Sequence, residues 1–404
     1  MMAHETPRFC HETTSQKQKR FLYFDSAATT LQKPPAVARA VGRALLEQTS
    51  PGRGGHRASM KAADIVWQCR EAAARLFSVN APEHIVFTHN ATHGLNMAIK
   101  SIVRPGDRVV ISHFEHNSVV RPLWAMGAEI VIAKSALFRP EAALAAFRAA
   151  IRPRTKLVVL NHVSNVFGYI LPVVEIAALC RRMGLPFILD ASQSAGVLEV
   201  NASALGADFI AMPGHKGLYG PQGTGVLICK DSPAKTLIEG GTGSDAMRRE
   251  MPEDLPDRLE AGTPNVPGIN GLLEGIRFVE NRGTANILGH ERVLLRYLRE
   301  GMTETPGIRL YAAEDAEVQT GVLSFQHEGI DCETLAQILG ERGAAVRAGL
   351  HCAPLAHEVA GTQERGTVRV SVSTFNTEGE VKKFLRILRQ VIKSSGPERK
   401  SERY

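Results

Sequence analysis

Between residues 84 and 230, short apolar runs alternate with helical patterns rich in Ala, Leu and Arg. Helical patterns such as 141–151 and 174–183 separate several of these runs. Strands that are apolar throughout, alternating with helices, are typical of a mostly parallel sheet covered on both faces. The sequence therefore predicts an α/β fold with a seven-stranded sheet, whose strands lie near residues 84–88, 108–112, 129–132, 156–160, 186–189, 208–211 and 225–228.

The pattern changes after residue 230. Residues 231–270 are rich in Gly, Pro and charge and are predicted to form a long loop region. A helical stretch at 271–301 then leads into a smaller α+β unit with strands near 321–326 and 367–373. The predicted organisation has four parts: a disordered tail at 1–20, a large domain at 21–270 whose first residues could pack on the small domain, a small domain at 271–393, and a disordered tail at 394–404.

Composition and charge narrow the class of protein only slightly. Of 404 residues, 44% are hydrophobic and 22% charged, as in an ordinary globular protein, and the net charge of +7 comes from scattered basic residues. That scatter predicts no nucleic-acid-binding module. The first twenty residues lack the apolar segment of a signal peptide, and the uncharged stretch 157–174 is broken by Asn161, His162 and Pro172. We therefore expect a cytoplasmic protein without a membrane span.

Six cysteines are spread along the chain and form no CxxC pair. In a reducing compartment this spacing favours free thiols over a disulfide framework or a zinc site. Most of them are expected to be small core residues, but Cys352 stands in a Gly-rich segment. The six are Cys10, Cys69, Cys180, Cys229, Cys332 and Cys352.

Polar residues follow five of the predicted strands. Ligands of open α/β sheets bind beyond the carboxyl ends of the strands, so these residues are expected to meet. The first group opens a helix with small polar residues, as a phosphate-binding turn does. Each group alone could be a helix cap or a satisfied loop, but together they predict one polar site. The groups lie at 90–96, 115–117, 161–165, 190–193 and 215–216.

The last group contains Lys216, which lies among five glycines between residues 212 and 225. Glycines permit a positive φ or a close approach, although a solvated lysine in a Gly-rich turn is the simpler alternative. A lysine near a phosphate site, with Asp190 ending a buried strand, fits pyridoxal phosphate (PLP). The lysine would form an imine with the aldehyde, and the aspartate would keep the pyridine nitrogen protonated. Nucleotide-binding motifs such as GxxxxGK[ST] are absent.

These features together resemble the class V, fold-type I PLP enzymes, and within them the cysteine desulfurases and selenocysteine lyases. The resemblance covers about residues 21–390 and implies a homodimer with a large PLP-binding domain and a smaller C-terminal domain. It rests on the segments DSAATT (25–30), EH (115–116), HVSN (162–165), DASQ (190–193), GHK (214–216), EAGTP (260–264) and RAGLHCA (347–353).

The resemblance implies a role for each cofactor-binding residue. Lys216 would hold the cofactor, Asp190 would pair with the pyridine nitrogen, Gln193 would bond the ring hydroxyl and His116 would stack on the ring. The phosphate would be bound by one subunit together with Thr263 of its partner. On the first subunit the phosphate-binding residues would be Thr92 and His215, with His93 beside them.

The resemblance also implies a reaction. L-Cysteine would be converted to L-alanine, leaving a persulfide on Cys352 for transfer to a sulfur-acceptor protein, as in iron–sulfur cluster assembly. Lys216 would move the α-proton, and His116 would exchange a proton near the sulfur. Asn165 and Arg369 would clamp the substrate carboxylate, a bidentate task suited to arginine. The remaining residues assigned to the substrate are His56 and Arg347.

Two positions depart from the family pattern. Pro213 stands where relatives place a Ser or Thr that bonds phosphate, and it offers neither a hydroxyl nor an N–H. Leu350 replaces a histidine that is common in the cysteine motif. His351 adjoins Cys352, but neighbours in an extended segment point in opposite directions, so His116 is the better candidate for proton exchange.

Several alternatives stay open on the sequence alone. Cys352 could be a buried structural thiol. The chain could be another class V enzyme: a selenocysteine lyase, a C–S lyase acting on a cysteine conjugate, or an aminotransferase in which Cys352 is idle. It could also be a non-catalytic partner protein with a PLP fold, which Pro213 slightly favours.

Overall fold

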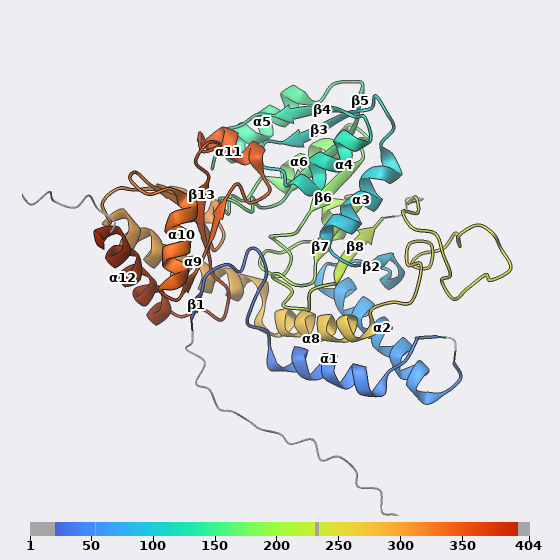
Figure 1. The fold of residues 1–404 in the computed structure, drawn as a ribbon. Coiled ribbons are helices and arrows are strands. Elements are labelled where there is room, and N and C mark those ends of the chain that lie inside the picture. The colour runs from blue at the N-terminus through green and yellow to red at the C-terminus, as the bar shows by residue number, and fades with distance from the viewer. Residues whose placement is uncertain (1–20, 53, 231–233, 395–404) are drawn as a thin grey trace, which may run out of the picture.

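The structure is a computed structural model that describes residues 21–52, 54–230 and 234–394 (Figure 1). The predicted N-terminal tail at 1–20, with Cys10, lies outside the described residues, as does nearly all of the predicted C-terminal tail. Ser394, which we assigned to that tail, is the last residue of a helix. No described helix combines the length and apolar character needed to cross a membrane.

The larger part of the protein is built on a seven-stranded sheet, as predicted, in the order β2-β8-β7-β6-β5-β3-β4. β8 runs antiparallel to both of its neighbours, and the other neighbouring pairs are parallel. All seven predicted strands are present: β2 (Ile85–Thr88), β3 (Arg108–Ser112), β4 (Glu129–Ala133), β5 (Thr155–Asn161), β6 (Phe187–Asp190), β7 (Phe209–Pro213) and β8 (Gly225–Cys229).

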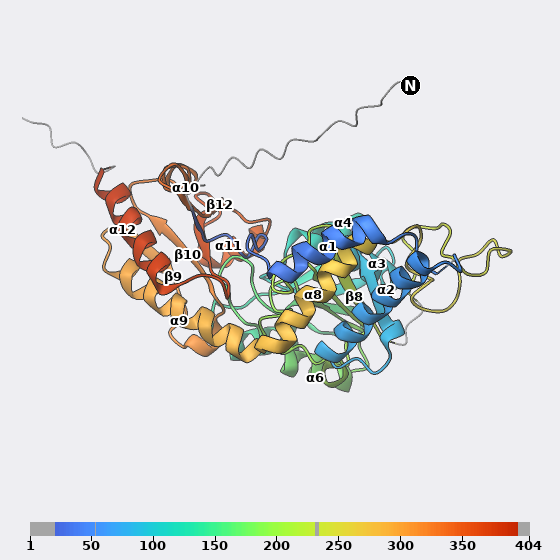
Figure 2. The ribbon, with the colours of Figure 1, turned by 90° about the horizontal axis from the view of Figure 1, so that it is seen from below.

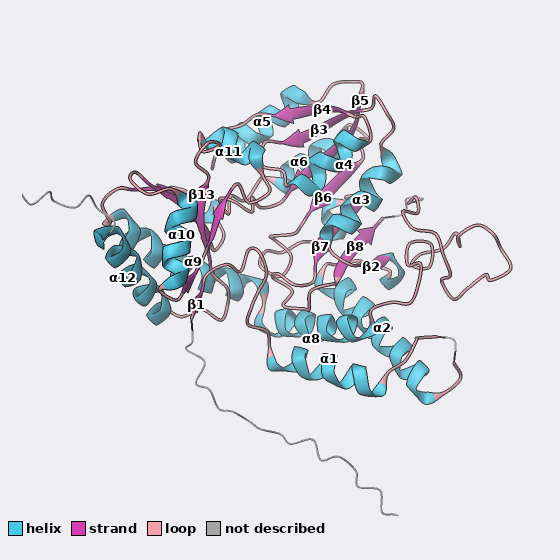
Figure 3. Ribbon diagram, in the orientation of Figure 1, coloured by secondary structure: helices cyan, strands magenta, loops and turns pink. Residues whose placement is uncertain are grey.

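Helices cover both faces of this sheet, which explains why its strands are apolar throughout (Figures 1 and 3). In β3, Val110 packs in the core beneath α2, α5, α6 and α8, whereas Val109 and Ile111 pack beneath α3 and α4 on the opposite face. The helices of this part are α1 (Pro35–Glu47), α2 (Arg57–Leu76), α3 (Ala91–Ile102), α4 (Asn117–Ala125), α5 (Pro140–Ala150), α6 (Val173–Arg182), α7 (Ala202–Leu205) and α8 (Val266–Arg282), with a short 3-10 helix η1 (Pro82–His84).

The smaller part contains an antiparallel four-stranded sheet in the order β12-β13-β10-β9. Its core contains buried side chains of α9, α10 and α12, which lie together at one end of the molecule (Figure 1). The elements are α9 (Thr284–Thr303), β9 (Ile308–Tyr311), η2 (Ala316–Val318), β10 (Val322–His327), α10 (Cys332–Glu341), β11 (Ala344–Ala345), β12 (Arg347–Gly349), α11 (Pro354–Ala360), β13 (Thr367–Ser371) and α12 (Glu378–Ser394).

The N-terminal strand β1 (Leu22–Tyr23) joins the smaller part, although it comes first in the chain. It pairs with β11 in parallel, and Leu22 and Phe24 lie in the core cluster of the small sheet. The Phe24 ring lies 5.0 Å from that of Phe384 on α12. The first described residues therefore pack on the small sheet and its helices.

The predicted helical stretch 271–301 is two helices, separated at Gly283. Gly283 has a φ of 78°, a conformation that favours glycine and ends α8. α8 packs against α1 and α2, while α9 packs against the small sheet and α12 (Figure 2). We propose that the boundary between the two domains lies near Gly283 rather than at residue 270.

Replacing Phe24 by alanine should destabilise the protein by about 3–5 kcal/mol, the usual cost of emptying a fully buried aromatic site. Chemical denaturation would measure this loss. Phe21→Ala is the matched control because Phe21 is 52% exposed, and we expect it to change the free energy of unfolding by less than about 0.5 kcal/mol. Equal effects of the two substitutions would contradict the packing described for the N-terminal strand.

Candidate functional site

A pocket lies at the carboxyl ends of the parallel strands β2, β3, β5, β6 and β7. It gathers residues from all five polar groups that the sequence placed at strand ends. Seven of the predicted site residues line it: Thr92, His116, Asn165, Asp190, Gln193, His215 and Lys216. The pocket is also lined by Asn90, Ala91, Ser118, Asn161, Val163, Ser192 and Pro213.

The glycines around Lys216 allow its loop to fold tightly against neighbouring backbone. A Cβ on Gly217 would overlap the carbonyl oxygen of Ala195, and one on Gly214 would overlap the Thr224 hydroxyl. On the other side, the carbonyl oxygen of His215 accepts hydrogen bonds from the backbone N–H and hydroxyl of Thr30, at 3.1 and 3.0 Å, and from Lys33 Nζ at 3.1 Å. The peptide that precedes Lys216 is thus fixed by several donors at once.

The amine of Lys216 lies among protein atoms, although the residue as a whole is only half-buried. Burial lowers its pKa from 10.5 to about 8, and the negative charge of Asp190 opposes that shift. The amine has no hydrogen-bond partner among the described residues. A large fraction of it is therefore neutral near pH 8 and able to act as a nucleophile or a base.

Asp190 is the last residue of β6 and is 4% exposed. The backbone N–H of Ser192 donates to its Oδ1 at 2.9 Å. Beside it, Gln193 Nε2 donates to the carbonyl of Ala27 at 3.0 Å. Asn161 lies opposite Asp190 in the register of β5 and β6, so adjacent strand ends place both side chains at the pocket.

A hydrogen-bonded chain joins His116, Ser118 and Thr92 across the pocket. Ser118 Oγ lies 2.7 Å from Thr92 Oγ1 and 2.9 Å from His116 Nδ1. The backbone N–H of Ser118 also donates to His116 Nδ1 at 3.0 Å, so that nitrogen is an acceptor and the neutral ring carries its proton on Nε2. Burial lowers the pKa of His116, although Asp190 opposes the shift, so the neutral ring is favoured.

His215 and the start of α3 also line the pocket. Asn90 caps α3, and its side chain accepts from the N–H of His93 at 2.9 Å. Burial lowers the pKa of His215 to about 4, and its Nδ1 lies 3.0 Å from Thr29 Oγ1. A helix N-terminus beside a threonine hydroxyl and a neutral imidazole is suited to a bound phosphate. Pro213 lines the pocket as well and contributes no donor.

Cys352 lies outside the lining of the pocket, in a tight turn that joins β12 to α11. The extended segment expected for His351 and Cys352 is wrong, because both have positive φ angles, 49° and 59°. Their side chains nevertheless lie in different surroundings: His351 is buried and Cys352 is exposed. Each such conformation costs roughly 1–3 kcal/mol in a residue other than glycine, so surrounding contacts must hold the turn.

Arg369, on β13, is 2% exposed and also lies just beyond the pocket lining. Its Nη2 donates to Asp25 Oδ1 at 2.8 Å, and its Nη1 donates to the backbone oxygen of Asn165 at 2.9 Å. Burial lowers its pKa, and Asp25 opposes the shift. Arg347 is opposite Arg369 in the strand register and is exposed.

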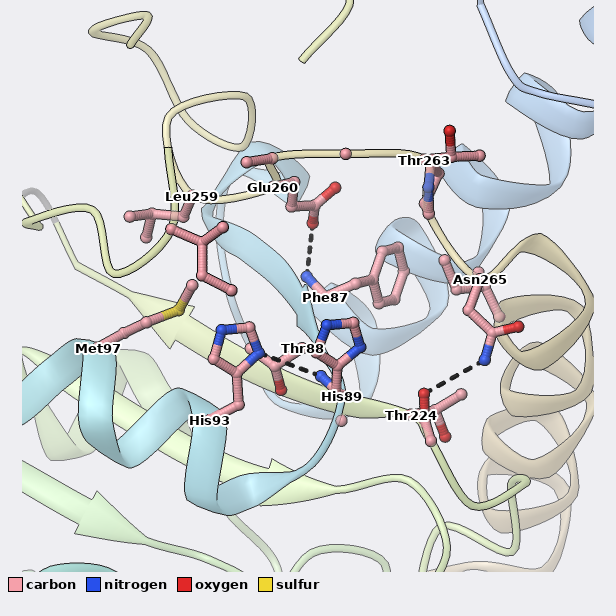
Figure 4. Close-up of a pocket in the computed structure, with 17 residues that line it drawn as sticks. Phe87, Thr88, His89, His93, Met97, Thr224, Leu259, Glu260, Thr263 and Asn265 are labelled. Atoms are coloured by element: carbon pink, nitrogen blue, oxygen red, sulfur yellow. Dashed lines mark hydrogen bonds between the residues drawn. The ribbon is translucent and has the colours of Figure 1, made fainter. Parts of the chain in front are cut away.

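Three predicted residues lie apart from Lys216. His93 and Thr263 line a different pocket, where the His93 ring stacks on that of His89 at 5.0 Å and Thr263 is on the opposite wall (Figure 4). Glu260 fixes the segment leading to Thr263, because it pairs with Arg70 and accepts from the N–H of Phe87 at 2.5 Å. His56 is exposed and caps α2. None of the three contacts the Lys216 pocket within one subunit.

Sequence reasoning assigned no individual role to several residues of this region. Ser118 follows His116 by two positions and Asn161 ends β5, so their positions after strands were the available signal. Asp25 lies in a recognised motif, but nothing in the sequence reveals its pairing with Arg369. Glu115 is fully buried behind the pocket, where burial raises its pKa to about 8.

The residues present fit the expected pyridoxal phosphate. The pocket is lined by an amine, a carboxylate, a neutral histidine and a helix N-terminus. In that order these groups suit an aldehyde, a protonated pyridine nitrogen, a ring face and a phosphate. The buried Oδ1 of Asn165 has no partner among the described residues. Such groups are stabilised when a polar ligand occupies the pocket.

Comparison with known proteins gives concordant results. The chain matches the family described as Aminotransferase class-V over residues 22–384. A probable cysteine desulfurase of Pyrococcus abyssi is 33% identical over 386 residues, which cover 92% of this chain and 94% of that protein. A probable cysteine desulfurase of Mycolicibacterium paratuberculosis is 32% identical over 387 residues, covering 92% of this chain but only 56% of that protein. The chain thus spans less than two thirds of the length of some of the relatives it matches.

Solved structures show the same fold. The apo structure of a cysteine desulfurase from Thermococcus onnurineus has a TM-score of 0.85 at 31% identity, covering 93% of this chain and 95% of that one. The cysteine desulfurase CsdA (S-sulfonic acid) from Escherichia coli has a TM-score of 0.82 at 25% identity, covering 93% and 96% of the two chains.

In the cofactor-free protein, acylation of Lys216 should show a pH midpoint of about 8 instead of 10.5, because burial disfavours the protonated amine. Mass spectrometry of the labelled peptide at a series of pH values would measure it. Lys382 is the internal control, since Glu378 raises its pKa. Asp190→Asn should lower the midpoint further by removing the charge that stabilises the protonated amine. A midpoint near that of Lys382 would contradict the description of the site.

Proposed function

Since the chain belongs to the class V aminotransferase family, we propose that it is a PLP-dependent L-cysteine desulfurase, which converts L-cysteine to L-alanine and leaves the sulfur as a persulfide on Cys352. The family match confirms the resemblance inferred from the sequence, and PLP is the cofactor of this family. The names of the relatives and the identities above 30% support the specific activity.

The observation that carries this proposal is the exposed thiol of Cys352 beside the pocket that contains Lys216. The carbonyl of Cys352 accepts from the backbone N–H of Asn117 at 2.8 Å, and Asn117 follows His116 directly. A plain amino transfer needs no thiol at this place. A thiol that is open to solvent can instead take a sulfur atom and pass it to another protein.

Bound PLP would supply an electron sink that weakens bonds to the carbon bearing the substrate amine. The chain's own residues would prepare and direct that chemistry. Asp190 would hold the positive charge on the ring nitrogen, and Gln193 would bond the ring hydroxyl. Lys216, neutral in a substantial fraction near pH 8, would carry a proton to and from the α-carbon.

The neutral ring of His116 carries its hydrogen on Nε2, so it would donate a hydrogen bond to the substrate sulfur and would give up a proton only from the imidazolium form. In the overall step, the bond between the substrate sulfur and its β-carbon breaks and a sulfur–sulfur bond to Cys352 forms. The carbon skeleton keeps the electron pair and gains a proton, so L-cysteine and a thiol yield L-alanine and a persulfide. We assign His116 a role in proton transfer near the sulfur.

Arg369 is proposed to bind the substrate carboxylate, with Asn165 beside it. The planar guanidinium suits a carboxylate, and Asp25 already occupies one of its nitrogen atoms in the manner of such a ligand. Arg347 lies on the neighbouring strand and would contribute positive charge at the entrance. The position of His56 apart from the pocket supports a role only across a subunit interface.

A homodimer is part of the proposal because the phosphate end of the pocket is incomplete in one subunit. Pro213 offers no donor, and Thr263 lies away from its own Lys216 pocket. A partner's Thr263 would supply the missing hydroxyl. The exposed Cys352 supports transfer of sulfur to an acceptor protein, and five free cysteines among the described residues are consistent with a cytoplasmic, reducing setting.

Cys352→Ala should abolish release of sulfur from L-cysteine while the absorbance of the bound cofactor still changes when L-cysteine is added. The thiol that accepts sulfur would be lost, whereas Lys216 and the pocket would remain. Alanine, sulfide and the visible spectrum would be measured together. Cys180→Ala is the control because Cys180 is a core thiol at the opposite end of α6 from the pocket, and it should leave all three nearly unchanged.

Undiminished sulfide and alanine from Cys352→Ala would rule out the persulfide route and favour another class V reaction. Selenocysteine and cysteine conjugates would then be tested as substrates of the same preparation. No cofactor absorbance in the wild-type protein would instead favour a non-catalytic partner protein.

Mixed dimers would test whether Thr263 acts across the interface. A subunit carrying Lys216→Ala and one carrying Thr263→Ala form one complete site in the mixed dimer, where Lys216 and Thr263 come from different chains. Cofactor retention after desalting should therefore be higher in the mixture than the mean of the two parents. A mixture that retains only the mean, or a chain that sediments as a monomer, would refute the contribution of Thr263 in trans.

A further inference from the structure

The turn that carries Cys352 is held by contacts from both parts of the protein. This turn consists of Leu350, His351, Cys352 and Ala353 and is called here the thiol turn. Within it, the N–H of Ala353 donates to the carbonyl of Leu350 at 2.9 Å. From outside it, Asn117 N–H donates to the Cys352 carbonyl at 2.8 Å.

A second outside contact comes from Asn165, whose Nδ2 donates to the His351 carbonyl at 2.7 Å. The His351 ring is held as well, because its Nε2 lies 3.2 Å from both the carbonyl oxygen and the hydroxyl oxygen of Thr367. Only the amide nitrogen can donate to a carbonyl oxygen, so the contact with the His351 carbonyl fixes the orientation of the Asn165 side chain. Its Oδ1 is then left as a buried acceptor without a partner among the described residues. Asn165 is 7% exposed and lines the pocket that contains Lys216.

Asn165 is also joined to Arg369, because its backbone oxygen accepts from Nη1 at 2.9 Å. One residue therefore contacts the arginine proposed to bind substrate, the pocket and the thiol turn. Two consecutive non-glycine residues with positive φ persist only where their surroundings enforce that conformation. The hydrogen bond from Asn165 acts directly on the first of these two residues.

We propose that Asn165 is a positioning residue for Cys352: its side-chain amide holds the His351–Cys352 turn in the conformation that presents the thiol to the Lys216 pocket. The expected effect on persulfide formation rests on the proposed desulfurase function. The expected effect on the conformation of the thiol turn does not. Any role of Asn165 in binding the substrate carboxylate is separate, since the contact with His351 uses one N–H of Nδ2 and leaves the other N–H free.

The test compares Asn165→Asp with the wild type in the cofactor-loaded full chain. Aspartate keeps the shape of the side chain but places an oxygen against the His351 carbonyl. Hydrogen exchange of the Asn117 and Ala353 amides should accelerate by roughly tenfold or more, as expected when one hydrogen bond is lost. Persulfide formation in a single turnover, at saturating L-cysteine, should fall by roughly tenfold or more, since small displacements of a reacting group are costly.

Asn270→Asp is the matched control. Asn270 is also 7% exposed and donates from Nδ2 to a single backbone carbonyl, that of Ala40 at 3.0 Å, on the helices α8 and α1. This control makes the same chemical change at a residue whose side-chain hydrogen bond does not involve the thiol turn. We expect it to leave the exchange of Asn117 and Ala353 and the yield of persulfide unaltered.

Unchanged exchange at Asn117 and Ala353 in Asn165→Asp would overturn the proposal, even if activity were lost. A variant whose persulfide formation is slow at low L-cysteine but normal at saturating L-cysteine would also overturn the proposal, because Asn165 would then act on substrate binding alone. Asn165→Ala, which removes the donor without adding repulsion, must show the same exchange pattern if the aspartate variant fails to fold. Absence of persulfide in the wild type would refute the proposed function, while the exchange comparison would still decide the role of Asn165.

Discussion

The proposed chemistry depends on the amine of Lys216, which lines the pocket without a hydrogen-bond partner among the described residues. Burial without a hydrogen-bond partner lowers its pKa to about 8, and the carboxylate of Asp190 limits that shift. Such an arrangement works against folding at neutral pH, because a lowered pKa means that the protonated amine is less stable in the native state than in the unfolded chain. The surrounding backbone must therefore enforce it. Glycines let the loop lie against Ala195, and Thr30 and Lys33 hold the His215 carbonyl from the other side.

Both parts of the protein contribute residues to the candidate site. The parallel sheet of the larger part brings Asp190 and Lys216 to one pocket, because strands that run the same way end at the same edge. The smaller part contributes Arg369 from β13 and the turn with Cys352 beyond β12. Contacts between the parts are specific: Arg369 donates to the backbone oxygen of Asn165, and the N–H of Asn117 donates to the Cys352 carbonyl. The Cys352 thiol and the Lys216 amine therefore belong to different parts of the protein that are joined by these contacts.

Sequence patterns predicted those features of the fold that follow from hydrophobic periodicity and from the direction of the strands. All seven strands of the large sheet and the gathering of polar residues at their ends follow from apolar runs and from the geometry of parallel strands. The residues at 22–76 were assigned no element, yet they form β1, α1 and α2. The secondary structure of these residues depends on segments that are distant in sequence, since β1 pairs with β11 and both helices pack on α8. Local composition does not encode such pairings.

The same distinction explains the error at Cys352. The motif identified the thiol, but an extended backbone was assumed where two left-handed residues occur. A positive φ is uncommon in any residue other than glycine, and although histidine is enriched there, two such residues in a row leave only a weak local signal. The turn is specified instead by donors far away in sequence, at Asn117 and Asn165. Because the second of these donors also faces the Lys216 pocket, the presentation of the thiol is a property of the assembled site, and the motif alone does not determine it.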